Sequence, residues 1–172
     1  MEKLKHKRFL ILLALAAVLI LLFAQGLSHG SPAPRVTFTS LQGKKIALES
    51  LHGKVVLVNF WATDCSVCMH EMPQLINTYR KYKAQGFETV AVAMSYDPPN
   101  YVLDYAEKNS LPFNVALDVQ GTIARAFGDV TLTPTVFIID KRGNIVKRIV
   151  GEPDFAQLDR LIEDKLAARV GA

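Results

Sequence analysis

The sequence predicts a three-layer α/β sandwich around a mixed β-sheet. Three apolar runs of strand length, Val55–Trp61, 89–95 and 135–140, are typical of strands that are covered on both faces. Segments with helical periodicity separate these runs, and a turn leads from the third run into an antiparallel strand at 145–150. The 172 residues, of which 50% are hydrophobic, are enough for one domain with a single core.

Two short alternating segments precede the first buried strand. Residues 36–38 and 45–48 flank Gln42 and Gly43, and this pattern predicts an N-terminal β-hairpin at the edge of the sheet. After the first buried strand, apolar residues recur at helical spacing until Gly86, where the helix is expected to stop. The apolar positions of this helix are Met69, Met72, Leu75, Ile76 and Tyr79.

The second half of the chain alternates in the same way. Asp97 is placed to be the N-cap of a helix that has Pro98 as its first residue. Residues 113–117 are a weaker strand candidate, and residues 122–127 are expected to form a short helix. Asp154 is expected to cap the final helix. The apolar stripe of that helix is formed by Phe155, Leu158, Leu161, Ile162 and Leu166.

The first thirty residues differ in composition from the rest of the chain. Residues 9–24 have no polar atom in any side chain, and they follow a cluster of Lys and Arg. Four cations and one Glu give residues 1–30 a charge of +3 out of the total of +4, so 16 basic and 15 acidic side chains remain. A net charge of +1 on the remainder argues against nucleic-acid binding.

The apolar run predicts export across a membrane. Cations stay in the cytoplasm, so the chain after the run faces the periplasm or another extracytoplasmic side. A helix over 9–27 would be about 28 Å long, close to the hydrocarbon thickness. We therefore expect residues 1–27 to be a single-pass signal-anchor, although Ala24-Gln25-Gly26 leaves a cleaved signal peptide as the alternative. Residues 28–35 are expected to be a linker and residues 36–170 the folded domain.

Cys65 and Cys68 lie where the first buried strand gives way to a helix. On a helix this spacing puts the two Cα atoms about 5–6 Å apart, within the range of a disulfide. The free N–H groups and the dipole at a helix N-terminus favour a thiolate, so Cys65 is predicted to attack and Cys68 to resolve the mixed disulfide. A structural disulfide is the alternative, but so short a loop restrains the unfolded chain weakly.

These cysteines belong to an ordered set of motifs. The set consists of an apolar strand, W-A-x-x-C-x-x-C, then Glu71 and Pro73, and Thr133-Pro134 just before a buried strand. It resembles the thioredoxin superfamily, specifically its membrane-anchored TlpA/ResA-like thiol–disulfide oxidoreductases. The resemblance extends from about Val36 to the last helix. It implies a thioredoxin-like three-layer α/β/α sandwich, a redox-active Cys65–Cys68 disulfide and no cofactor.

The resemblance also implies roles for further residues. Pro134 matches the family's cis-proline, and the backbone of Thr133 would pair with an incoming substrate segment. Glu71 matches a glutamate that influences both sulfurs, and Asn59 stands where thioredoxin has a buried aspartate, which leaves Glu71 as the proton acceptor. A solvated helix position is the alternative for Glu71. Trp61 would form a wall of the site or pack as an ordinary core aromatic.

Two residues beside the cysteines depart from the pattern of the family. Asp64 stands where most relatives carry an aromatic residue, and its negative charge should oppose thiolate formation at Cys65. Val67 replaces a frequent proline. The dipeptide Ser66-Val67 between the cysteines is therefore not one from which a reduction potential can be assigned.

The resemblance implies an enzyme of the bacterial inner membrane, with its folded domain on the extracytoplasmic side, that reduces protein disulfides. Electrons would reach it from a membrane donor of the thiol-transporter type, and its substrates would be apocytochrome c during cytochrome c maturation or the cysteines of copper-site proteins.

Two other functions can be weighed against this one. Met69 and His70 follow Cys68 and raise the possibility of a copper-delivery module. Consecutive helix positions point about 100° apart, however, and such relatives usually have CxxxC and a distant histidine, so no metal site is expected. The P-x-x-x-T-x-x-C context of a thiol peroxidase is absent.

Overall fold

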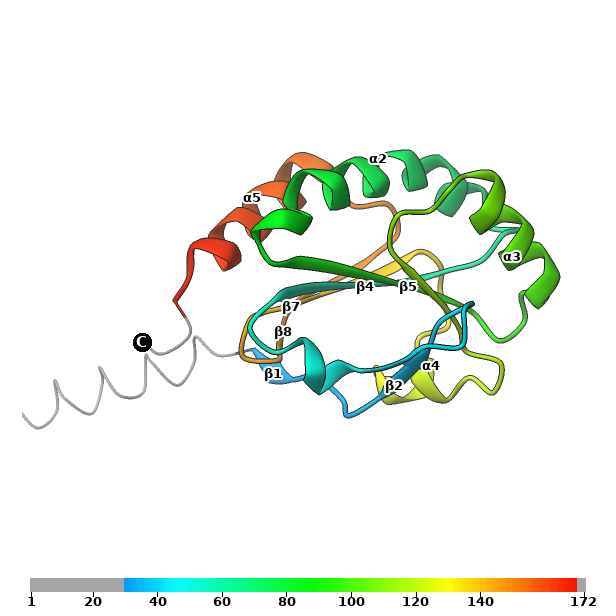
Figure 1. Ribbon diagram of the computed structural model, residues 1–172, viewed down its shortest axis with the longest axis horizontal. Coiled ribbons are helices and arrows are strands. Elements are labelled where there is room, and N and C mark those ends of the chain that lie inside the picture. Colours follow the sequence, from blue (N-terminus) through cyan, green and yellow to red (C-terminus); the bar gives the residue numbers. More distant parts are fainter. Residues whose placement is uncertain (1–29, 170–172) are drawn as a thin grey trace, which may run out of the picture. The chain divides into compact units, whose positions relative to one another are not determined.

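The computed structural model describes residues 30–169, which contain a six-stranded mixed sheet (Figure 1). In order across this sheet the strands are β1 (Ser31–Pro32), β8 (Asn144–Val150), β7 (Thr135–Ile139), β4 (Val55–Trp61), β5 (Phe87–Ala93) and β6 (Asn114–Leu117). β4, β5 and β6 are parallel to one another, whereas β7 and β8 are antiparallel to their neighbours. The three apolar runs of the sequence thus form the three central strands.

β4 is the central strand that leads to the cysteines. It lies between β7 and β5, and all 7 of its residues are buried. Its side chains alternate between two hydrophobic cores: Val58 and Phe60 belong to one, and Leu57 and Trp61 to the other. Asn59 is fully buried and points to the same side as Leu57 and Trp61.

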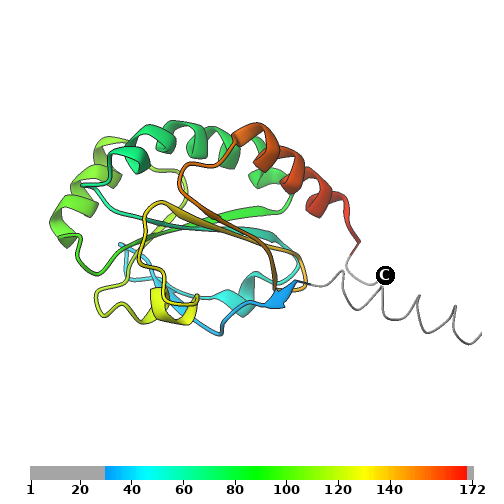
Figure 2. The ribbon, with the colours of Figure 1, turned by 180° about the vertical axis from the view of Figure 1, so that it is seen from behind.

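Different elements cover the two faces of the sheet (Figures 1 and 2). The face that bears Trp61 is covered by helices α2 (Ser66–Tyr82), α3 (Pro99–Lys108) and α5 (Phe155–Ala167). The opposite face is covered by the hairpin of β2 (Thr37–Thr39) and β3 (Lys45–Ala47), the 3₁₀ turn η1 (Leu48–Leu51) and the short helix α4 (Thr122–Ala126). A second 3₁₀ turn, η2 (Lys83–Gln85), continues α2 as far as Gly86. The predicted three-layer sandwich is confirmed.

The N-terminal strands are arranged differently from the sequence expectation. β2 and β3 form a two-stranded sheet of their own, and a bridge between Ser40 and Ala116 links the hairpin to β6. Phe38 is fully buried, so the hairpin covers the core instead of extending the main sheet. Within the predicted linker, Ser31 and Pro32 pair with β8 as the edge strand β1.

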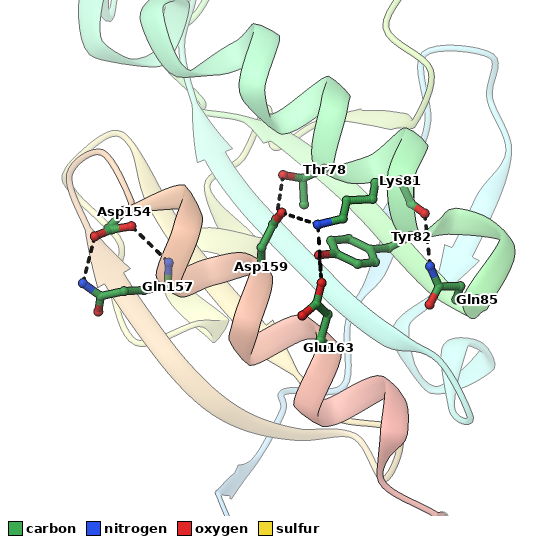
Figure 3. Close-up of polar contacts among 8 residues, drawn as sticks. All are labelled: Thr78, Lys81, Tyr82, Gln85, Asp154, Gln157, Asp159 and Glu163. Carbon is green, nitrogen blue, oxygen red and sulfur yellow. Dashed lines mark hydrogen bonds and ion pairs between the residues drawn. The ribbon is translucent and has the colours of Figure 1, made fainter.

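Polar contacts join the C-terminal half of α2 to α5 (Figure 3). Lys81 Nζ lies 2.9 Å from Asp159 Oδ2 and 3.4 Å from Glu163 Oε1. The hydroxyl of Thr78 donates to Asp159 at 3.2 Å, and the hydroxyl of buried Tyr82 donates to Glu163 at 2.6 Å. These contacts fix the end of α2 that lies far from the cysteines.

Of the two predicted helix caps, one is confirmed and one is wrong. Asp154 accepts a hydrogen bond from the N–H of Gln157 at 3.0 Å and caps α5 as predicted. At α3, Pro98 occupies the N-cap position without a side-chain hydrogen bond. Asp97 does not cap that helix, because both of its carboxylate oxygens bind Thr63 in the loop after β4.

The predicted membrane segment, residues 1–27, lies outside the residues that the structure describes. Within residues 30–169, no helix combines the length and the apolar character needed to cross a membrane.

Candidate active site

A tight turn at the end of β4 presents Cys65 to the start of α2. The N–H of Cys65 donates to the carbonyl of Ala62 at 3.2 Å, and Cys65 is the N-cap residue of α2. Its sulfur accepts a hydrogen bond from the N–H of Cys68 at 3.1 Å. The Cys65 sulfur therefore uses one of the free N–H groups at the helix N-terminus, an environment that favours a thiolate.

Cys65 and Cys68 form a disulfide, with their Cα atoms 5.2 Å apart. Cys68 is fully buried in the hydrophobic core beneath α2, whereas Cys65 is partly exposed. Asp64 and Val67, on either side of Cys65 in the sequence, are exposed as well. A thiolate that approaches from solvent therefore meets the sulfur of Cys65 first.

Glu71 lies one helical turn after Cys68 and is 1% exposed. This burial excludes the alternative that Glu71 is a solvated residue on the helix surface. Its Oε1 accepts a hydrogen bond from Asn59 Nδ2 at 3.3 Å. Within residues 30–169, Glu71 Oε2 and Asn59 Oδ1 have no hydrogen-bond partner. β4 and α2 thus bring together a buried amide and a buried carboxyl group.

Burial determines the titration of Glu71. Loss of hydration raises the pKa of this carboxyl group from its ordinary value of 4.5 to about 8. The hydrogen bond from Asn59 opposes this rise, and the negative charge of Glu152 adds to it. Glu152 also lies 3.7 Å from Nε2 of His70. At pH 7, therefore, Glu71 is mainly protonated while the cysteines are joined.

The loop before β7 contains a cis peptide bond between Thr133 and Pro134, as the resemblance implies. The carbonyl of Pro134 accepts a hydrogen bond from Gly151 at 2.8 Å. The hydroxyl of Thr135 donates to the carbonyl of Leu132 at 2.7 Å. Pro134 is buried, whereas Thr133 is partly exposed and Leu132 is 63% exposed.

Residues 94–97, which follow β5, contact both of these loops and were not predicted as site residues. Asp97 binds Thr63 in the loop after β4. The Tyr96 hydroxyl lies 3.3 Å from the hydroxyl of Thr133. A signal for this arrangement exists in the sequence, because the carboxyl ends of adjacent parallel strands meet at one edge of a sheet. This rule, applied to the sequence, would have placed the residues after the second buried strand near those after the first.

Trp61 packs as a core aromatic. It is fully buried, and its ring centroid lies 5.4 Å from that of Tyr105 in α3. It belongs to the same hydrophobic core as Cys68. Its indole Nε1 has no hydrogen-bond partner among the described residues. Trp61 and Cys68 are thus both part of the core on the α2 side of the sheet.

The residues considered for copper binding lie on α2. The side chain of His70 is 74% exposed and faces Glu152, and Met69 is partly buried against the core. Within residues 30–169, no cluster of three or more His, Cys, Asp or Glu side chains is arranged to hold a metal ion.

Comparison with known proteins gives consistent results. The Redoxin family model matches residues 28–162. The thiol-disulfide oxidoreductase ResA of Bacillus thuringiensis subsp. konkukian is 38% identical over 134 residues, which are 78% of this chain and 76% of that protein. ResA of Bacillus subtilis is 36% identical over 127 residues, covering 74% of this chain and 70% of that protein.

A solved structure shows the same fold. The crystal structure of a thiol:disulfide interchange protein of the thioredoxin family from Chlorobium tepidum superposes with a TM-score of 0.73 at 31% identity. The match covers 80% of this chain and 97% of that one. A disulfide with one accessible sulfur at a helix N-terminus is the arrangement that thiol–disulfide exchange requires. The chain therefore belongs to the Redoxin family and is a ResA-like thiol–disulfide oxidoreductase with a thioredoxin-like fold.

Proposed function

We propose that the chain reduces disulfides of other proteins on the extracytoplasmic side of a bacterial inner membrane. In this proposal residues 1–27 anchor the enzyme, residues 28–35 connect it and residues 36–170 carry the activity. The observation that supports it most is the unequal exposure of the two cysteine residues, because a dithiol enzyme needs one attacking cysteine and one protected resolving cysteine.

The first step forms a mixed disulfide. The thiolate of reduced Cys65 attacks one sulfur of the substrate's cystine, a bond forms between Cys65 and that sulfur, and the other substrate sulfur leaves as a thiolate. The N–H of Cys68 hydrogen-bonds to the Cys65 sulfur and favours its thiolate. Thr135 of β7 pairs with Phe60 of β4, so the partly exposed Thr133 precedes β7 at the edge of the sheet where β4 ends, and in this proposal its backbone pairs with the substrate chain.

The second step releases the reduced substrate. Cys68 loses its proton and attacks the Cys65 sulfur, so that the Cys65–Cys68 disulfide forms and the second substrate thiolate leaves. Two electrons pass from the cysteine sulfurs to the substrate, and the two substrate thiolates take up protons from solvent, equal in number to those that Cys65 and Cys68 give up. Glu71, one turn from Cys68, accepts the Cys68 proton in those molecules in which its carboxyl group is ionised. Burial raises the pKa of this group to about 8, near that of a thiol, so the ionised fraction is small at pH 7 and grows as the pH rises.

The charges around the site favour the reducing direction. A cysteine pair whose reduced form has strongly stabilised thiolates acts as an oxidant. Acidic neighbours destabilise the thiolates and so favour the disulfide form, which makes the pair a reductant. Asp64 is exposed directly before Cys65, and its negative charge opposes part of the stabilisation that the helix N-terminus gives the Cys65 thiolate. A membrane dithiol donor of the thiol-transporter type would then reduce the pair again. Apocytochrome c and copper-site proteins are the proposed substrates.

Single cysteine variants test this function. Wild type and the variants Cys65→Ser and Cys68→Ser are assayed for reduction of a protein disulfide, with a dithiol as the electron source. Cys65→Ser should lose turnover, and Cys68→Ser should accumulate a mixed disulfide with the substrate through Cys65. Full turnover by Cys65→Ser would reject the mechanism. Trapping with the membrane-bound Cys68→Ser chain, followed by mass spectrometry, identifies the substrates, and adducts without cytochrome or copper-site proteins would reject that assignment.

A further inference from the structure

Two tight turns lie side by side at the carboxyl ends of the parallel strands β4 and β5. In the first, the N–H of Cys65 bonds to the carbonyl of Ala62, which makes Thr63 and Asp64 its central residues. In the second, the N–H of Asp97 bonds to the carbonyl of Met94 at 3.0 Å. The N–H of Met94 also bonds to the carbonyl of Trp61 at 3.0 Å, so strand pairing continues up to the turns.

The side chain of Asp97 joins the second turn to the first. Its Oδ2 accepts the N–H of Thr63 at 2.7 Å, and its Oδ1 accepts the hydroxyl of Thr63 at 2.6 Å. Asp97 is 4% exposed, so these two bonds are formed almost out of contact with water. The N–H of the first central residue of a β-turn, here Thr63, has no hydrogen-bond acceptor within the turn itself. The carboxylate of Asp97 supplies that acceptor.

We propose that Asp97 is a positioning residue for thiol–disulfide exchange, because it holds the turn that keeps the Cys65 sulfur at the N-terminus of α2. Thr63 lies two residues before Cys65 and 34 residues before Asp97 in the sequence. The remaining fixed points of the Cys65 sulfur are its hydrogen bond from Cys68 and, in the oxidised state, the disulfide itself. After reduction the disulfide restraint is gone, and the turn then acts together with the hydrogen bonds that Cys65 receives from the N–H groups of Cys68 and Met69 to keep it at its cap position.

Tyr96, the residue before Asp97 in the second turn, contacts the loop that precedes β7. The hydroxyl of Tyr96 lies 3.3 Å from that of Thr133, next to the cis-proline. Asp97 thus fixes the turn that carries the attacking sulfur, and Tyr96 contacts the loop proposed to bind substrate. The inference rests on the proposed role of Cys65 as the attacking sulfur.

The test measures how fast the reduced cysteine at position 65 is alkylated between pH 5 and pH 10 in a Cys68→Ser background. Asp97→Ala removes both bonds to Thr63, so the Cys65 sulfur should spend less time at the helix N-terminus. We expect the midpoint of its alkylation profile to rise by about one pH unit, which lowers the rate at pH 7 about tenfold. Asp97→Asn should recover most of the rate, because its amide can accept the Thr63 N–H and donate to the Thr63 hydroxyl.

Asp118→Ala is the matched control. Asp118 is a buried carboxylate (3% exposed) that accepts the N–H groups of Ile123 and Ala124 at 3.0 and 2.7 Å, at the start of α4. Its loss should lower the unfolding temperature without moving the alkylation profile. An Asp97→Ala profile equal to wild type, or a profile shifted equally by Asp118→Ala, would overturn the proposal.

Two further variants keep the test decisive. If Asp97→Ala does not fold, Thr63→Val removes the hydroxyl bond alone and should shift the profile in the same direction, whereas Thr63→Ser should restore it. Failure of Asp97→Asn to recover the rate would indicate that charge acts instead of hydrogen bonding, and would also overturn the proposal. The alkylation assay uses no protein substrate. A wild-type chain without disulfide reductase activity would therefore reject the proposed function while leaving the positioning role measurable.

Discussion

Replacing Glu71 by Gln tests the central electrostatic feature of the site. The carboxyl group is buried, receives one hydrogen bond from Asn59, and has a pKa raised from 4.5 to about 8 in the folded, oxidised chain. In the unfolded chain the same group titrates near its ordinary value. As the pH rises above 4.5, the unfolded state ionises freely while the folded state must stay protonated. The stability associated with Glu71 is therefore complete below pH 4.5 and is lost progressively as the pH rises toward 8.

The size of the effect follows from the two pKa values. Each pH unit within this window costs the wild type about 1.4 kcal/mol once the unfolded group is largely ionised. Between pH 5 and pH 7 the unfolding free energy of the wild type should fall by about 2.5 kcal/mol relative to Glu71→Gln. The glutamine amide is neutral at every pH, so the variant lacks this slope. Above pH 8 the difference should level off, because Glu71 then ionises in both states.

Guanidinium unfolding of the oxidised proteins at pH 5, 6 and 7 measures this difference. Glu107→Gln is the control, because Glu107 is an exposed residue of α3 and its replacement should leave the pH dependence of the wild type unchanged. A wild-type minus Glu71→Gln difference that stays constant from pH 5 to pH 7, or that changes in the opposite direction, would refute the raised pKa of Glu71.

Three stability predictions follow from packing elsewhere. Tyr82→Phe removes the hydroxyl that donates to Glu163 at 2.6 Å and should lower the free energy of unfolding in urea by about 1 kcal/mol. An unchanged unfolding midpoint would show that this hydrogen bond does not stabilise the fold. Gly143 has a φ of +84°, and Gly143→Ala would bring a Cβ into steric conflict with the imidazole of His52, so it should destabilise the fold by about 1–2 kcal/mol; His52→Ala should relieve only the steric part of this cost. Leu158→Ala leaves a cavity at a buried position of α5 and should lower the free energy of unfolding, measured by calorimetry, by about 2–5 kcal/mol. A decrease of less than about 1 kcal/mol would contradict the close packing of Leu158.

The sheet was largely predictable because its signals are local. The apolar run of Val55–Trp61 would expose apolar side chains to water at the edge of a sheet, and in the structure it is the central strand β4. The spacing of Cys65 and Cys68 likewise fixed the distance between their Cα atoms, because three residues at a helix start allow little variation. The Thr133-Pro134 loop was recognised from its motif, and the cis bond followed from the resemblance.

The expectations that failed concern residues whose placement depends on distant parts of the chain. Asp97 precedes a helix and has the residue type of an N-cap, so local reasoning assigned it to α3. In the folded chain the N–H and hydroxyl of Thr63 offer it two bonds in a buried place, and these displace the local cap. The hairpin of β2 and β3 was expected at the sheet edge, but burial of Phe38 draws it over the sheet.

By itself, the amino-acid sequence determined the succession of strands and helices along the chain from Thr37 onward, the dithiol at the start of a helix and the family to which the chain belongs. Only the tertiary structure decided that Glu71 is buried against Asn59, that Asp97 holds the turn before Cys65, and that Tyr96 meets Thr133. Periodicity and capping act over a few residues and can be read along the chain. The environment of a carboxyl group depends on which distant segments exclude water from it, and only the packed fold specifies them.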